Sequence, residues 1–124
     1  MHKFLNKIVN GNSLKVLETI PDNTFDLIFA DPPYNLQIGK KLTRPDDSKV
    51  NGVNDDWDYF KSFNEYDNFC KKWLAECKRV LKETGTIWVI GTYHNIFRLG
   101  YHIQNMDYWI LNDIIWKKNN PMPN

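Results

Sequence analysis

Two short apolar runs on either side of a long amphipathic segment constrain the fold of this chain most strongly. Residues 25–30 read FDLIFA, which is apolar on both faces and typical of a central parallel strand. Residues 86–90 read TIWVI and predict a second buried strand, which Gly91 stops. Strands that alternate with helices at short intervals favour an α/β fold with a mostly parallel sheet.

The segment between these runs predicts a helix with one broad apolar face. Its apolar residues recur at intervals of three and four. They are Tyr66, Phe69, Cys70, Trp73, Leu74, Cys77, Val80 and Leu81. Gly85 is expected as the C′ residue beyond the end of this helix. Its two cysteines would lie roughly 10 Å apart, beyond disulfide reach, and are expected as reduced core thiols of a cytosolic protein.

A shorter helix is expected near the N-terminus. Either Asn12 or Ser13 can cap it. It begins near Leu14, and Pro21 closes it before the first strand.

The C-terminal part predicts one more helix and one more strand. Residues 94–106 form the helix, with His94 and Asn95 read as its start rather than as ligands. The inward positions of this helix are Ile96, Leu99 and Ile103. Residues 108–116, YWILNDIIW, are the strand candidate. The whole chain then predicts a partial doubly wound sheet of about four strands.

Residues 38–64 have no sustained period, and a loop of this length inside a compact domain is usually functional. Its first half is basic through Lys40, Lys41 and Arg44, which could contact phosphate or form a solvated loop. Trp57, in its acidic second half, could wedge into DNA or merely pack its own loop.

Composition excludes some classes of protein and leaves others open. The formal net charge is +1, so any nucleic-acid site must be local rather than a property of the whole surface. No apolar stretch approaches the roughly 20 residues that span a bilayer, and the N-terminus does not read as a signal peptide. The histidines and cysteines lack zinc-binding spacing, so no metal is expected.

Asp31-Pro32-Pro33-Tyr34 follows the first strand directly, where ligands collect in parallel sheets. One interpretation is a rigid strand exit, in which Asp31 satisfies a turn and Tyr34 packs. The other is a binding pocket. Prolines donate no hydrogen bond, so their carbonyls can face a ligand, and a nearby carboxylate adds a second acceptor. Two acceptors and a tyrosine face suit an exocyclic amine on a flat base.

These four residues resemble the signature of DNA amino-methyltransferases, and an aspartate in first place points to adenine. The resemblance implies that the base is flipped into the pocket. Asp31 and the Pro32 carbonyl would accept the two amine protons, and Tyr34, with Pro33, would hold the base against the sulfonium. The amine attacks the methyl group directly, so no general base or metal is implied.

Longer stretches extend the resemblance over essentially the whole chain: FADPPYNLQ, DDWDYFKSF, WLAECKRVLKETGTIWVIGTYHNIFRLG and NDIIWKKNNPMPN. They are similar to the permuted (beta) class of DNA adenine methyltransferases, of the cell-cycle-regulated type specific for GANTC. The resemblance implies a methyltransferase-like Rossmann fold, S-adenosyl-L-methionine as cofactor, double-stranded DNA as partner and a cytoplasmic, nucleoid-associated location. It also allows a homodimer.

The resemblance assigns further residues to the cofactor and to DNA. Gly11-Asn12-Ser13 aligns with a Gly-Asp-Cys or Gly-Asp-Ser stretch whose acid contacts the cofactor's adenine, and Asn12 departs from that acid. The expected cofactor contacts are Asn12, Ser13, Asp31 and Pro32. The expected DNA contacts are Asn35, Lys40, Lys41, Arg44 and Trp57.

The Gly-rich turn of methyltransferases is missing, because no two of the six glycines lie two positions apart. We therefore expect residues 1–116 to be the N-terminal half of the catalytic domain and residues 117–124 the start of a truncated target-recognition region. A complementary C-terminal half would be a partner. Half a sheet exposes an edge and an apolar face, so self-association is expected.

Three functions remain open at this point. The first is adenine methylation, alone or with a complementary half. The second is a catalytically inactive module that binds DNA or a partner. The third is a pocket for another planar amine, such as a free nucleotide or an RNA base, against which the DDWDYF and NNPMPN stretches argue.

Overall fold

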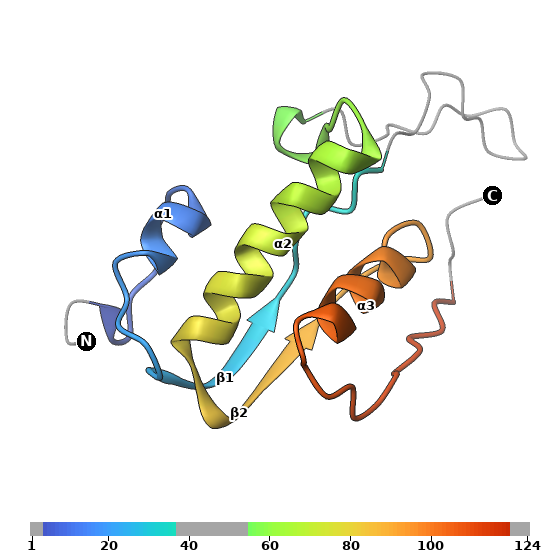
Figure 1. Ribbon diagram of the computed structural model, residues 1–124. Helices are drawn as coiled ribbons and strands as arrows, with labels where there is room; N and C mark the ends of the chain where they lie inside the picture. Colours follow the sequence, from blue (N-terminus) through green and yellow to red (C-terminus); the bar gives the residue numbers. More distant parts are fainter. Residues whose placement is uncertain (1–3, 37–54, 120–124) are drawn as a thin grey trace, which may run out of the picture.

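The computed structural model of the chain describes residues 4–36 and 55–119 (Figure 1). In chain order, its elements are helix α1 (Ser13–Leu17), strand β1 (Phe25–Ala30), the 3-10 helix η2 (Asp56–Asp58), helix α2 (Phe63–Val80), strand β2 (Leu81–Val89) and helix α3 (Ile96–Asn105). The α/β class and the bounds of the first strand agree with the prediction from sequence.

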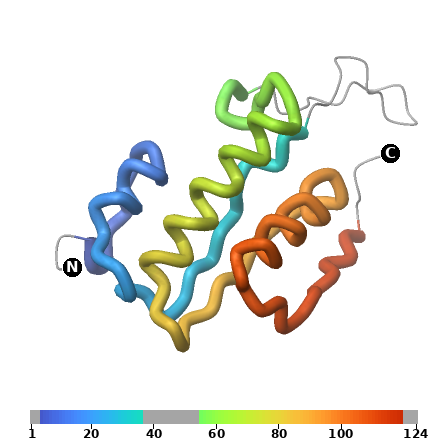
Figure 2. Tube along the Cα trace, in the orientation of Figure 1, coloured from blue at the N-terminus to red at the C-terminus, as the bar shows by residue number. Residues whose placement is uncertain are grey.

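The two strands pair in parallel, with α2 as the connection between them. Figure 2 traces them side by side. Ile28 lies opposite Ile87, and Ala30 lies opposite Val89. The backbone N–H of Ile90 donates to the Ala30 carbonyl at 2.8 Å, so the pairing continues to the carboxyl ends.

The second strand begins earlier than predicted, at Leu81 rather than at Thr86. Leu81 fits the apolar spacing of α2, but its pairing with Phe25 draws it into the sheet. Gly85 is therefore a strand residue, and the prediction of a helix C′ position there was wrong. Glycine suits this position because there is no room for a side chain: a Cβ at Gly85 would lie 2.8 Å from the Leu81 side chain.

Helix α2 supplies most of the core, and its predicted apolar face is confirmed. Ser62 caps its start by accepting from the Glu65 N–H at 3.2 Å, while the Glu65 carboxylate accepts from the Lys61 N–H at 3.0 Å. The buried core cluster consists of Phe60, Tyr66, Cys70, Trp73, Leu74, Cys77 and Leu99. Burial raises the pKa of both free thiols, Cys70 and Cys77, to about 11.

Arg79 fastens the other end of α2 to the segment between α1 and β1. Its guanidinium donates to the carbonyls of Leu17 and Ile20, both at 2.8 Å, and to the Asp22 carboxylate at 2.6 Å. These contacts hold α1 beside α2. Asn12 is the N-cap of α1, which settles the choice between Asn12 and Ser13.

The sheet has one covered face and one bare face. Ile28, Ala30, Ile87 and Val89 pack against the core cluster beneath the helices. Side chains alternate along a strand, so the intervening residues point the other way. Those residues include Leu27, Phe29 and Trp88, which are 56%, 64% and 50% exposed.

The prediction of about four strands in a doubly wound sheet is corrected by this arrangement. Within residues 4–36 and 55–119 there are two strands, and the helices that pack on them lie on one face. Residues 108–116 were expected as a strand but form none. A strand needs a neighbour for its backbone groups, and the exposed residues 109–119 pair with no strand in the part of the chain that the structure describes.

Candidate functional site

The Asp31–Tyr34 segment lies where the sequence places it, at the carboxyl end of β1. The segment that begins with Gly91 leaves the carboxyl end of β2. Since β1 and β2 are parallel neighbours, both exits lie at one edge of the sheet.

Asp31 and Tyr34 contact one another directly. The Tyr34 hydroxyl donates to Oδ1 of Asp31 at 2.5 Å. Burial, together with the hydrogen bond to Asp31 and the negative charges of Asp31 and Asp58, raises the pKa of Tyr34 to about 12. The tyrosine therefore remains a neutral donor at physiological pH. Oδ2 of Asp31 makes no hydrogen bond within the part of the chain that the structure describes, and Asp31 is exposed.

A buried carboxylate clamps the backbone that follows Tyr34. Asp58, which is 5% exposed, accepts from the backbone N–H groups of Asn35 and Leu36, both at 2.9 Å. Asn35 has a φ of 54°, in the left-handed region where asparagine is better tolerated than most residues. The 3-10 helix η2 presents Asp58 for this contact.

A second set of buried contacts holds the Pro33 carbonyl. The Tyr66 hydroxyl donates to this oxygen at 2.9 Å, and Nδ2 of Asn95 donates to the Tyr66 hydroxyl at 3.1 Å. Oδ1 of Asn95 accepts from the Thr92 N–H at 2.7 Å. Tyr66 and Asn95 are each 1% exposed. The exits of β1 and β2 are thereby linked through α2.

The other site residues predicted from sequence do not all lie beside the Asp31–Tyr34 segment. Asn12 accepts from the Lys15 N–H at 3.3 Å. Within residues 4–36 and 55–119, neither Asn12 nor Ser13 hydrogen-bonds to the Asp31–Tyr34 segment. Trp57 is 62% exposed on η2, next to Asp58 in the sequence. The remaining three, Lys40, Lys41 and Arg44, lie outside the described residues.

Sequence reasoning did not identify Asp58, Tyr66 or Asn95 as part of this site. Tyr66 was assigned to the core and Asn95 to a helix start, and both assignments also hold. One signal was available, because a buried tyrosine hydroxyl normally finds a partner.

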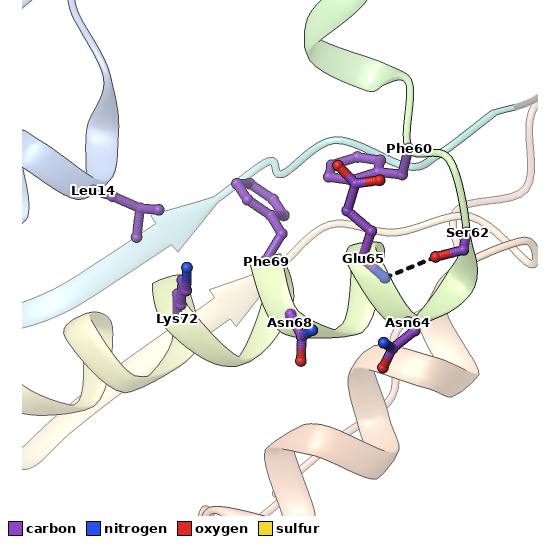
Figure 3. Close-up of a pocket in the computed structure, with 8 residues that line it drawn as sticks. All are labelled: Leu14, Phe60, Ser62, Asn64, Glu65, Asn68, Phe69 and Lys72. Carbon is purple, nitrogen blue, oxygen red and sulfur yellow. Dashed lines mark hydrogen bonds between the residues drawn. The ribbon is translucent and has the colours of Figure 1, made fainter.

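A shallow hollow of about 480 Å³ lies elsewhere, between α1 and the start of α2 (Figure 3). It is lined by Leu14, Phe60, Ser62, Asn64, Glu65, Asn68, Phe69 and Lys72. None of these residues was predicted as part of a site.

Comparison with known proteins gives one family. The family described as DNA methylase matches residues 25–124. The chain is 56% identical over 124 residues to the Type II methyltransferase M.HinfI of Haemophilus influenzae, covering 100% of this chain and 34% of the relative. It is 41% identical over 117 residues to the Type II methyltransferase M2.LlaDCHI of Lactococcus lactis subsp. cremoris, covering 94% of this chain and 43% of the relative.

The chain thus spans less than half the length of these two relatives. Among the described residues, no helix is long and apolar enough to cross a membrane. The same residues contain no group of three or more His, Cys, Asp or Glu side chains that could hold a metal ion.

Proposed function

The chain belongs to the DNA methylase family, and on that premise we propose that it carries the amine-binding pocket of an adenine-specific DNA methyltransferase. The observation that supports this most is the position of Asp31 and Pro32, an exposed carboxylate and a proline carbonyl directly after β1. DNA methyltransferases of this family use S-adenosyl-L-methionine as the methyl donor.

In the proposed reaction, a target adenine leaves the DNA stack and enters the site, at an unstacking cost of a few kcal/mol. One N–H group of the amine donates a hydrogen bond to the Asp31 carboxylate, and the other donates to the Pro32 carbonyl. These two hydrogen bonds orient the amine so that its nitrogen lone pair, which is otherwise delocalised into the ring, is localised on the nitrogen. The ring of Tyr34 holds the base by stacking.

The cofactor supplies an electrophilic methyl group on a sulfonium. When bound, it would offer that methyl group to the amine nitrogen that Asp31 and Pro32 hold. The surplus amine proton leaves to solvent past Asp31. Asp31 and Pro32, together with Asn12 and Ser13 at the start of α1, are the proposed cofactor contacts.

We also propose that this chain acts with a second segment that corresponds to the rest of its longer relatives. The bare sheet face with Leu27, Phe29 and Trp88 supports the proposal, because such a face is costly to leave in water. A GANTC-like target and the permuted class are proposed from the resemblance described above. Residues 1–116 would then be the catalytic half, with residues 117–124 entering the target-recognition region.

A second candidate is a module that binds DNA or a partner without catalysis. The glycine spacing favours it, because the sequence contains no Gly-rich turn for the cofactor.

The test is transfer of labelled methyl from S-adenosyl-L-methionine to duplex DNA containing GANTC. The chain is assayed alone and mixed with the remaining segment of the Haemophilus relative. Asp31→Ala should abolish transfer, whereas Asp26→Ala, which removes an exposed carboxylate at the opposite end of β1, should leave it intact. Binding of DNA by the mixture without any transfer would favour the second candidate.

A further inference from the structure

We infer that Tyr66 and Asn95 are positioning residues that set the direction of the Pro33 carbonyl and, through it, that of the Pro32 carbonyl. The consequence for methyl transfer rests on the proposed function, whereas the positioning itself does not. Neither residue lies in the Asp31–Tyr34 segment. They reach it from α2 and from the start of α3.

The direction of each hydrogen bond follows from chemistry. A backbone N–H can only donate, so the Thr92 N–H selects the oxygen of the Asn95 amide. The amide nitrogen must then face Tyr66, where it donates to the hydroxyl oxygen. The hydroxyl proton is thereby left to point at the Pro33 carbonyl.

Proline geometry turns this contact into control of the neighbouring carbonyl. The Pro32 carbonyl belongs to the peptide plane that ends at the Pro33 nitrogen. Two torsions separate that plane from the Pro33 carbonyl, and the ring of Pro33 locks one of them, φ. The hydrogen bond from Tyr66 fixes the other by holding the Pro33 carbonyl.

Among the described residues, few other contacts hold the Asp31–Tyr34 segment. Neither proline has an N–H, so neither can donate to a neighbouring strand. The segment is held after Tyr34 by the Asp58 carboxylate, and at Pro33 by Tyr66. Because Tyr66 and Asn95 are almost fully buried, water cannot replace a lost partner, and the unpaired groups would carry a penalty.

The chain offers a matched pair of variants. Tyr66→Phe deletes a hydroxyl that donates to the Pro33 carbonyl at 2.9 Å and keeps the ring that packs edge-on to Phe60. Tyr108→Phe deletes a hydroxyl that donates to the Leu74 carbonyl at 3.0 Å, in the middle of α2.

Asn95→Asp is a third variant, nearly isosteric, in which both side-chain oxygens accept. It would draw the Tyr66 proton away from Pro33.

The decisive measurement is amide hydrogen exchange of Asn35 and Leu36 by NMR on the full chain, compared with exchange in the core of α2. Tyr66→Phe and Asn95→Asp should speed exchange at these two amides by about tenfold relative to the core, because one buried hydrogen bond is lost. Tyr108→Phe should not change that ratio. An unchanged ratio in Tyr66→Phe, or an equal change in Tyr108→Phe, would overturn the inference.

Methyl transfer provides the functional arm, measured with the mixture described above. Tyr66→Phe should lower kcat by about tenfold and change KM little, since DNA contacts are untouched while the acceptor carbonyl is misdirected. Equal kcat values for the two tyrosine variants would refute a role in the reaction. If the unsubstituted chain transfers no methyl group, the proposed function fails, and the exchange ratios still decide whether Tyr66 and Asn95 position the segment.

Discussion

The hydroxyl of Tyr34 and the carboxylate of Asp31 are joined by a hydrogen bond of 2.5 Å, three residues apart in one rigid segment. Two groups proposed to hold the target base are therefore coupled before any base arrives. Whatever neutralises or displaces Asp31 changes the environment of the tyrosine, which makes Tyr34 a reporter on the site.

The first prediction concerns the titration of Tyr34. An ultraviolet titration, as the difference between the unsubstituted chain and Tyr34→Phe, should show this tyrosine ionising at a pKa of about 12. Asp31→Asn should lower that pKa, because the carboxylate charge is removed while burial remains. Ionisation of Tyr34 near its ordinary value of about 10 in the folded chain would contradict both the burial of Tyr34 and its contact with Asp31.

The same shift has a consequence for stability. The folded pKa lies above the unfolded one, so the unfolded chain loses the Tyr34 proton first as pH rises. The contribution of Tyr34 is therefore complete below a pH of about 10 and is lost as pH approaches about 12. Urea unfolding across this range should show a smaller decline for Tyr34→Phe.

The second prediction concerns the Asp58 clamp. In Asp58→Asn, one acceptor oxygen becomes an NH₂ group that faces a backbone N–H. The expected loss is about 1–3 kcal/mol in the free energy of unfolding, because a buried donor is left unpaired. Asp56→Asn, an exposed change on the same 3-10 helix, should cost no more than about 0.5 kcal/mol. Similar losses from both variants in urea unfolding would show that Asp58 is not a clamp.

The spacing of apolar residues along the sequence was sufficient to predict β1 and the buried face of α2. The run at 25–30 gave β1 its bounds, since the prolines after Asp31 cannot continue a strand ladder. The apolar spacing from Tyr66 to Val80 gave α2 its buried face. The position of the Asp31–Tyr34 segment followed from the parallel sheet.

Contacts between distant parts of the chain decided what local pattern could not. Leu81 suits both α2 and β2, and its partner Phe25 lies 56 positions earlier in the numbering. Residues 108–116 consist of two apolar runs on either side of Asn112 and Asp113, but within the described residues they pair with no strand. The Tyr66 hydroxyl donates to the carbonyl of Pro33, which lies 33 positions earlier in the sequence. The apolar spacing of α2 therefore predicted that the Tyr66 ring is buried, but it could not predict the hydrogen-bond partner of the hydroxyl.

The third prediction concerns the bare face of the sheet. Phe29 is 64% exposed on that face, while the adjacent Ile28 packs against the core. Phe29→Thr should reduce self-association in sedimentation velocity and change the free energy of unfolding by no more than about 0.5 kcal/mol, because threonine suits a strand and little burial is lost.

Ile28→Thr is the matched control, with the same new side chain one position earlier. It should cost about 1–3 kcal/mol, because it removes packed apolar volume and brings a hydroxyl toward the core. If Phe29→Thr destabilises the chain as much as Ile28→Thr, the two faces are not distinct.

A sharp monomer peak for the unsubstituted chain at moderate concentration would mean that the exposed apolar face does not drive association. In the mixture with the longer relative's remaining segment, Phe29→Thr should weaken assembly, since that face is where the segment is proposed to pack.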